Sequence, residues 1–267
     1  MSLFTASLNS GSNGNCYYVA TNEDAVLIDA GISCRETEAR MKRLSLSMKK
    51  VRAIFVTHEH TDHIKGVAGI SKKYKLPVYV TPTTFRHRRL RVKENLVRPF
   101  KAYEPITIGG LTITGVPKFH DASDPHSFIV SNETVKVGVF TDLGVACNDV
   151  INNFKQCHAA FLETNYDEKM LETGPYSERL KHRIKSDIGH LSNAQALELF
   201  LKHRPPFMSH LFLSHISKEN NSPLLVESLF RPFAGETNIV VASRYRETGV
   251  FHISDKPVMK EIQLELF

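Results

Sequence analysis

An apolar, strand-like run at residues 53–56 leads directly into a cluster of metal-ligand side chains, and no other segment constrains the chain as strongly. The cluster consists of His58, His60, Asp62 and His63. Side chains alternate along an extended segment, so His58 and His60 point the same way and can share one metal ion. Asp62 and His63 follow where the chain turns into a helix, which directs them toward a second ion. Because imidazole suits Zn, Mn or Fe and the carboxylate adds an oxygen ligand, the segment predicts a metal centre.

Composition limits the kind of protein that can carry such a centre. Of the 267 residues, 42% are hydrophobic and 23% are charged, which provides a sizeable core and excludes a disordered chain. No apolar run approaches the roughly 18 residues of a membrane helix, and the first residues do not resemble a secretory signal. The four cysteines form no C-x-x-C pair, which favours free thiols and a cytoplasmic location. A net charge of +6 permits a polyanionic partner without requiring one.

We expect a single α/β domain that spans residues 1–267. Short β-prone segments cluster early and again late, helices are interspersed between them, and no linker or repeat divides the chain. Ser33 with Glu36, and Ser192 with Gln195, each predict a capping box at the start of a helix. This pattern suggests two sheets packed together with helices outside them.

The H-x-H-x-D-H motif at residues 58–63 resembles that of the metallo-β-lactamase superfamily, and further matches extend along nearly the whole chain. The resemblance implies a four-layer αβ/βα sandwich with a two-metal site at one edge. It also implies that Asp29, after the strand-like residues 25–28, orients the ligand loop from behind. His120 is favoured over His126 as the next ligand because it directly follows a strand-like stretch.

The same resemblance implies two divalent ions bridged by Asp142, since one carboxylate can hold two metals about 3.5–4 Å apart. For the first ion the expected ligands are His58, His60, His120 and Asp142. For the second ion they are Asp62, His63, Asp142 and His215. Zn or Mn is the expected metal, with Fe as an alternative.

Glu163, at the end of a strand-like run, and His190, just before a capped helix, resemble a proton-transfer pair of ribonuclease Z. The resemblance implies that Glu163 orients His190 and that His190 donates a proton to the leaving oxygen. Asp62 is expected to accept the proton of the nucleophile. The alternative for His190 is a structural histidine whose ring meets the Ser192 cap.

A dense basic segment covers residues 86–101, in which Glu94 is the only acid. Such a segment can neutralise several phosphates and give salt-dependent binding. Its candidate phosphate contacts are Arg86, Arg88, Arg89 and Arg91. Ser192 and Lys218 are further candidates because they are close in sequence to His190 and His215. An ordinary solvated surface is the alternative for the basic segment.

The turn at residues 10–15 and the segment at 120–125 resemble the YycJ-type subfamily, whose members are associated with exonuclease activity on DNA. The resemblance implies a phosphodiesterase acting on nucleic acid, with DNA favoured over RNA. The interval from Asp142 to Glu163 is too short for the large insertion that clamps nucleic acid in ribonuclease J-like enzymes. A hydrolase of thioesters or lactones remains the alternative, because its metal site would be identical.

Overall fold

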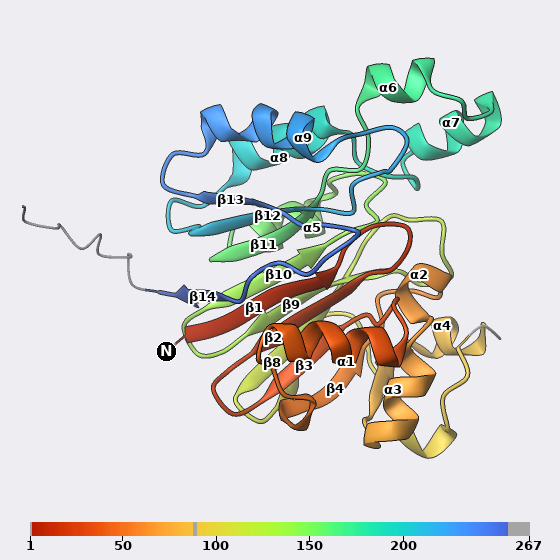
Figure 1. Ribbon diagram of the computed structural model, residues 1–267, viewed down its shortest axis with the longest axis vertical. Helices are drawn as coiled ribbons and strands as arrows, with labels where there is room; N and C mark the ends of the chain where they lie inside the picture. Colours follow the sequence, from red (N-terminus) through yellow and green to blue (C-terminus); the bar gives the residue numbers. More distant parts are fainter. Residues whose placement is uncertain (1, 88–89, 256–267) are drawn as a thin grey trace, which may run out of the picture.

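The computed structural model describes residues 2–87 and 90–255, and two seven-stranded sheets face each other in it (Figure 1). The first sheet has the strand order β14-β1-β2-β3-β4-β5-β6. These strands are β1 (Ser2–Asn9), β2 (Cys16–Ala20), β3 (Ala25–Ile28), β4 (Val51–Phe55), β5 (Val78–Val80), β6 (Val97–Pro99) and β14 (Phe251–Ser254). β1 to β3 form an antiparallel meander, whereas β3 to β6 run parallel.

The second sheet repeats this plan in the second half of the chain, with the order β13-β12-β11-β10-β9-β8-β7. Its strands are β7 (Ile106–Ile108), β8 (Leu111–Pro117), β9 (His126–Ser131), β10 (Lys136–Phe140), β11 (Ala159–Glu163), β12 (His210–Ser214) and β13 (Asn238–Val241). β7 to β10 are antiparallel, and β10 to β13 are parallel. Each sheet therefore has one parallel half, in which the strands end at a common edge.

Helices cover the outer face of each sheet and complete four layers (Figure 1). On the first sheet they are α1 (Cys34–Arg43), α2 (Thr61–Ile64), α3 (Val67–Tyr74) and α4 (Pro82–Arg86). On the second they are α5 (Asn148–Phe154), α8 (Asn193–His203) and α9 (Pro223–Phe230), whereas α6 (Glu168–Thr173) and α7 (Glu178–Lys185) pack in a small cluster of their own. The α/β class and the four-layer αβ/βα sandwich are confirmed. In the part of the chain that the structure describes, no helix has the length and apolar character to cross a bilayer.

Aromatic rings from both sheets meet in the core between them. The Phe55 ring of β4 lies 5.5 Å from Phe128 of β9, and the Tyr17 ring of β2 lies 4.7 Å from Phe161 of β11. These residues belong to one buried cluster to which both sheets contribute. The opposite face of each sheet packs on helices, so strands such as β3 and β11 are buried along their whole length. Burial on both faces explains why these strands appear in the sequence as continuous apolar runs.

The two predicted capping boxes form to different extents. Ser192 accepts the backbone N–H of Gln195, and the Gln195 side chain bonds back to the cap, so this box is complete. Ser33 also accepts the N–H of Glu36, but the Glu36 carboxylate accepts from Arg40 at 2.7 Å instead. The first helix thus begins as predicted with only half of the box.

The helix expected after the ligand cluster is interrupted at Gly66. It consists of α2 and α3, because the Gly66 N–H donates to the Ala30 carbonyl at 2.7 Å. At this point the loop after β3 touches the helix backbone, and a Cβ on Gly66 would lie 1.9 Å from the Ile32 oxygen. The break lets this loop approach the metal-ligand segment.

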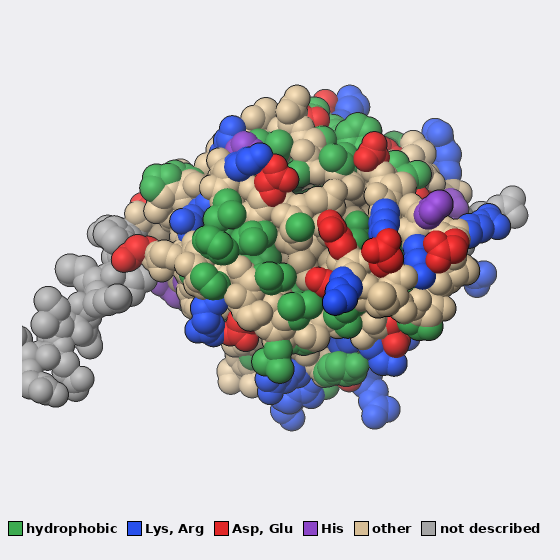
Figure 2. Space-filling model, turned by 90° about the horizontal axis from the view of Figure 1, so that it is seen from above, with side chains coloured by type: hydrophobic (Ala, Val, Ile, Leu, Met, Phe, Trp, Pro, Cys, Tyr) green, Lys and Arg blue, Asp and Glu red, His purple; other side chains and the backbone are tan. Residues whose placement is uncertain are grey.

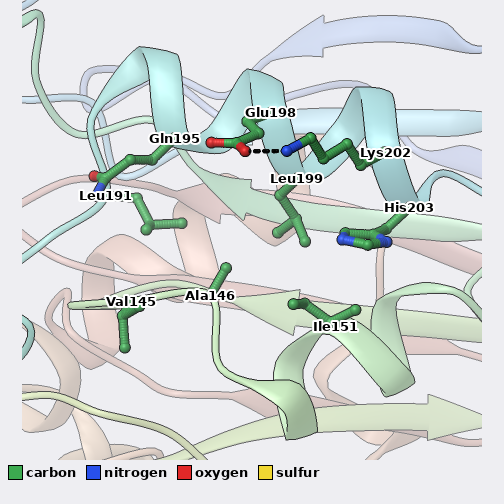
Figure 3. A pocket seen from close by; sticks show the side chains of 9 residues that line it. All are labelled: Val145, Ala146, Ile151, Leu191, Gln195, Glu198, Leu199, Lys202 and His203. Atoms are coloured by element: carbon green, nitrogen blue, oxygen red, sulfur yellow. Dashed lines mark hydrogen bonds and ion pairs between the residues drawn. The ribbon is translucent and has the colours of Figure 1, made fainter.

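Figure 2 shows the face over α6, α7, α8 and α9, on which basic, acidic and hydrophobic side chains are mixed. Below this face, a cavity of about 260 Å³ lies between α5 and α8 (Figure 3). Apolar side chains such as Leu191 and Ile151 line it, and the Glu198–Lys202 ion pair stands at one side. None of the expected metal ligands lines this cavity.

The close packing at Gly66 can be tested against Gly69, which lies inside the following helix, α3. Gly66→Ala is expected to lower the free energy of unfolding by at least about 2 kcal/mol, because the methyl group would collide with a backbone oxygen. A Cβ on Gly69 meets only the Cys34 side chain, at 3.4 Å, so Gly69→Ala should stabilise by about 0.5–1 kcal/mol. Urea denaturation measures both changes. Equal effects of the two substitutions would contradict this account of the helix break.

Candidate metal centre

Imidazole nitrogens and carboxylate oxygens converge where the parallel strands end. They form four overlapping groups, and within each group the ligand atoms lie within 4.8 Å of one another. Two of the groups are His58, His60 and His120, and His58, His63 and Asp142. The other two are Asp62, His63 and His215, and Asp142, Glu163, His190 and His215. Because the groups share members, the structure brings all seven expected ligands, together with Glu163 and His190, into one continuous centre.

Asp142 lies in the middle of this centre. Its Oδ1 is 3.7 Å from His120 Nε2 and 3.6 Å from His215 Nε2. Its Oδ2 is 3.1 Å from His63 Nε2. One carboxylate therefore faces histidines from both expected ligand sets, which is the placement that a bridging ligand needs.

Two ring nitrogens, His58 Nε2 and His215 Nε2, are buried and form no hydrogen bond with any residue that the structure describes. An unpaired buried polar atom costs about 1–3 kcal/mol, so such atoms are rare without a reason. The opposite nitrogens are held in place: His58 Nδ1 lies 2.9 Å from Thr57 Oγ1, and His215 Nδ1 lies 2.8 Å from Glu163 Oε1. A ring fixed through one nitrogen, with the other free, is the arrangement of a metal-binding histidine. The donor set therefore fits divalent cations of the zinc and manganese type.

The buried carboxylates make this centre strongly attractive to positive charge. Burial alone would lower the pKa of His63, but Asp142, Asp29 and Asp62 raise it well above its usual range. His215 is likewise buried, and chiefly through Asp142 its pKa rises to about 10. Each carboxylate here needs a nearby positive charge, which a protonated imidazole or a divalent cation can supply.

Asp29 holds the loop that carries the ligands, residues 57–63, from the side opposite the metal centre. Its Oδ1 accepts the Thr57 N–H and its Oδ2 accepts the Thr57 hydroxyl, both at 2.8 Å. The same Oδ2 lies 2.7 Å from His63 Nδ1, which leaves the His63 Nε2 directed at Asp142. All of these atoms belong to buried residues, so the histidine has little freedom to turn.

Glu163 holds two histidines with a single oxygen. Its Oε1 lies 2.8 Å from His190 Nδ1 and 2.8 Å from His215 Nδ1, while its Oε2 accepts the Leu143 N–H at 2.6 Å. Burial would raise the pKa of this carboxyl, but His190 and His215 lower it to about 2. His190 Nδ1 also lies 3.9 Å from Asp142 Oδ1. The geometry places the expected pair, Glu163 and His190, at the edge of the metal centre.

Three residues of the centre have left-handed backbone conformations. Asp29, Asp142 and His215 have φ of +59°, +55° and +53°, and each directly follows the end of a strand or lies within two residues of it. Asp, Asn and His accept this conformation more readily than most residues, although it still costs about 1–3 kcal/mol. The sharp turn redirects the chain at the sheet edge and points each side chain into the site.

Of the two histidines in the segment 120–126, His120 lies in the metal centre and His126 does not. His120 Nδ1 donates to the Gly189 carbonyl at 3.0 Å, and its Nε2 lies 3.3 Å from His60 Nδ1. His126 packs edge-on against Phe100, with ring centroids 5.2 Å apart, and belongs to none of the four ligand groups.

The expected substrate contacts lie in different surroundings. Ser192 is completely buried and its hydroxyl serves the helix cap, so it is not available to a substrate in this structure. Lys218 is exposed and pairs with Glu219 at 3.1 Å. Arg86 and Arg91 are both exposed, Arg86 at the end of α4 and Arg91 in the loop that follows. Arg88 and Arg89 lie outside the described residues.

Three buried residues of the centre had not been expected from the sequence. Asn15 Nδ2 lies 3.0 Å from His63 Nε2 and 3.3 Å from Asp62 Oδ2. Asn165 donates to the His215 carbonyl at 2.9 Å, and the Lys118 ammonium donates to the Thr141 carbonyl at 2.6 Å. Asn15 ends the glycine-rich turn at residues 10–15, so this turn is the signal that could have revealed it.

Comparison with protein families gives a match to the β-lactamase superfamily domain over residues 24–216, which contains every residue of the centre except Asn15. The chain belongs to the β-lactamase superfamily. An exodeoxyribonuclease of Bacillus anthracis, YycJ, is 35% identical over 224 residues, which cover 83% of this chain and 85% of the relative. The exodeoxyribonuclease WalJ of Streptococcus pneumoniae is 30% identical over 219 residues, or 80% and 81% of the two chains. The resemblance stated from the motifs is confirmed.

Among solved structures, the metallo-β-lactamase fold protein YhfI of Bacillus subtilis superimposes with a TM-score of 0.71 at 13% identity. The superposition covers 94% of this chain and 100% of YhfI. At this identity it supports the fold, and the fold agrees with the superfamily match.

Divalent cations should stabilise the protein, because they neutralise the buried carboxylates of the centre. Adding zinc or manganese to chelator-treated protein is expected to raise the melting temperature by about 5–10 °C. This follows from about 2.7 kcal/mol at a concentration 100-fold above Kd and about 2–4 °C per kcal/mol. Asp142→Asn should lose most of the shift, whereas Asp187→Asn, at an exposed position, should keep it. An equal shift in both variants would show that Asp142 does not hold the cation.

Proposed function

We propose that this chain is a metal-dependent phosphodiesterase that hydrolyses nucleic acid, with DNA as the favoured substrate. The observation that carries the proposal is the Glu163–His190 pair beside Asp142, with His190 Nε2 free of hydrogen bonds to the described residues. A thioester hydrolase would not need a proton donor at this position, because its thiolate leaves without one. The exodeoxyribonuclease names of YycJ and WalJ support the same class of substrate.

We propose two divalent metal ions in the centre, Zn or Mn, with Fe as an alternative. The first is assigned to His58, His60, His120 and Asp142. The second is assigned to Asp62, His63, Asp142 and His215. The unpaired nitrogens of His58 and His215 and the central position of Asp142 support this assignment. When bound, such ions supply Lewis acidity toward a phosphate and lower the pKa of water.

The residues of the chain supply positioning and proton transfer. Asp29 and Glu163 hold the histidine rings so that the ligand nitrogens stay aimed at the centre. Asp62, which is only partly buried, can accept the proton of the attacking water. The Nδ1–H of His190 donates a hydrogen bond to Glu163. A doubly protonated ring therefore has its second proton at Nε2, from which it can pass to the leaving oxygen. Partial exposure of the His190 side chain, at 16%, leaves this edge accessible to a substrate.

The exposed basic side chains would bind the phosphate backbone rather than act in the chemical step. We propose Arg86, Arg91 and Lys218 as contacts, together with Arg88 and Arg89. The proposal extends to one domain over residues 1–267, supported by the core that both sheets share, and to a cytoplasmic location, supported by four free cysteines.

Turnover of end-labelled DNA and RNA, with zinc or manganese added to metal-free protein, tests the proposed function. Cleavage should depend on the metal, and KM should rise steeply with salt because backbone contacts release counterions. Thioester and lactone substrates provide the comparison. Turnover of a thioester with no cleavage of either nucleic acid would overturn the proposal. Faster cleavage of RNA than of DNA would make RNA, not DNA, the favoured substrate.

His190→Ala is expected to lower the rate of DNA hydrolysis by about 10²–10⁴, the usual contribution of a positioned general acid. Both metals should remain bound, because His190 is not assigned as a ligand. The loss should be smaller on bis(p-nitrophenyl) phosphate, since that leaving group needs no proton. Metal analysis and steady-state kinetics measure these effects. Release of a metal would instead make His190 a ligand, in agreement with its place in one of the ligand groups.

A further inference from the structure

A small cavity lies close to His215 of the metal centre. Ser10 connects them, because its hydroxyl accepts the His215 N–H at 2.8 Å and its own N–H donates to the carbonyl of Ser243, in the cavity wall, at 3.1 Å. The cavity has a volume of about 110 Å³, and its wall begins at Ile216, the residue after His215. The opposite wall is the segment 242–245, which follows β13. Pockets for whole drug-sized ligands hold roughly 300–1,000 Å³, so this cavity suits a smaller group such as a phosphate.

Arg244, in this wall, has no neutralising carboxylate among the residues that the structure describes. Its Nη1 is buried and forms no hydrogen bond with the described residues, and its Nη2 lies 3.3 Å from Ser12 Oγ. Among the described residues no carboxylate forms an ion pair with it, whereas the nearby Arg40 and Arg43 pair with Glu36 and Glu247. A guanidinium that is partly buried, fixed at one nitrogen and otherwise unpaired has the chemistry of an anion-binding group.

The backbone around Arg244 is held firmly in place. Asn13 donates to the Arg244 carbonyl at 2.8 Å, and Arg40 donates to the Tyr245 carbonyl at 3.1 Å. The turn at residues 10–15 fits closely here, because a Cβ on Gly11 would lie 3.2 Å from the Arg244 Cβ. The other end of the same turn carries Asn15, beside Asp62 and His63. One turn therefore fixes both the cavity wall and part of the metal centre.

Tyr245 presents its ring to solvent next to this cationic group. Its side chain is 71% exposed although its backbone is bonded to Arg40, so the ring is not part of the core. Lys218 lines the opposite wall of the same cavity, and its ammonium group pairs with Glu219 at 3.1 Å. A fixed guanidinium, an ammonium group and an exposed aromatic ring are the elements with which proteins bind single-stranded nucleic acid.

We infer that Arg244 and Tyr245 form a binding subsite for the substrate strand beside the metal centre. Arg244 binds a phosphate next to the one that is cleaved, and Tyr245 stacks on the neighbouring base. The inference rests on the proposed nuclease function. It adds to that function the path of the substrate strand, which leaves the metal centre past His215. The subsite accounts for the unpaired guanidinium and for the exposed ring together.

Steady-state kinetics on a single-stranded DNA oligonucleotide test the subsite, with bis(p-nitrophenyl) phosphate as a substrate that has no second phosphate. Arg244→Ala should raise KM for the oligonucleotide about tenfold and reduce the slope of log KM against log salt by about 0.7. The increase in KM for bis(p-nitrophenyl) phosphate should be at least several times smaller than that for the oligonucleotide. Arg246→Ala is the matched control, because Arg246 is exposed, lies two positions further on and does not line the cavity.

Tyr245 requires its own pair of variants. Tyr245→Ala should raise KM for the oligonucleotide about tenfold, whereas Tyr245→Phe should retain most of the affinity because the stacking surface remains. Oligonucleotides with and without a terminal phosphate distinguish an internal from a terminal phosphate at Arg244. If KM of the wild-type protein depends on the terminal phosphate and this dependence disappears in Arg244→Ala, Arg244 binds the terminal phosphate. If KM is the same with and without a terminal phosphate, Arg244 binds an internal one.

The outcomes separate the subsite from the proposed function. Wild-type protein that cleaves no nucleic acid overturns the function. Wild-type protein that cleaves DNA while Arg244→Ala behaves like Arg246→Ala overturns the subsite alone. Equal losses on DNA and on the small diester, or a lower melting temperature or metal content in Arg244→Ala, would show that Arg244 only supports the fold.

Discussion

The buried hydrogen bonds of Asp29 are the interaction on which the metal centre depends. One carboxylate ties the end of β3 to Thr57 and to His63, and so joins the first strand-end loop to the ligand segment. Because the residue is fully buried, nothing from solvent can replace these bonds. These hydrogen bonds fix the His63 ring so that it faces Asp142. Because His63 follows a strand of the first sheet and Asp142 a strand of the second, their contact joins both sheets in one site.

Glu163 has the corresponding function in the second sheet. It stands at the end of β11, between the strands that lead to Asp142 and His215, and it fixes two rings through one oxygen. Each sheet thus contributes one buried carboxylate that does not have to bind a metal itself. Asp29 and Glu163 can hold the histidine rings in place before a cation binds. This matters because metal sites work best when their ligands are already oriented.

Much of this arrangement could be predicted from the sequence, because its signals are local. Strands buried on both faces are visible as apolar runs, and the H-x-H-x-D-H spacing depends only on neighbouring residues. The edge strand β6 gives little signal in the sequence, because it has three residues, is largely exposed and ends in proline. α6 and α7 are also short, with six and eight residues, and they pack in a small cluster of their own, apart from the main core. Asn15 and Asn165 act through long-range contacts with His63 and His215, which no local pattern reveals.

The left-handed residues at the strand ends show where this protein gives up stability for activity. Asp29, Asp142 and His215 occupy a backbone conformation that glycine would adopt with less strain, but glycine has no side chain to bind a cation or hold a ligand. At Asp142 and His215 of the metal-free chain, glycine would relieve this backbone strain, so cation binding is what retains aspartate and histidine there. Asp29 differs, because its buried carboxylate also holds Thr57 and His63. Among random variants of the metal-free protein, gains in thermal resistance at positions 142 and 215 should accompany loss of the enzyme's chemistry.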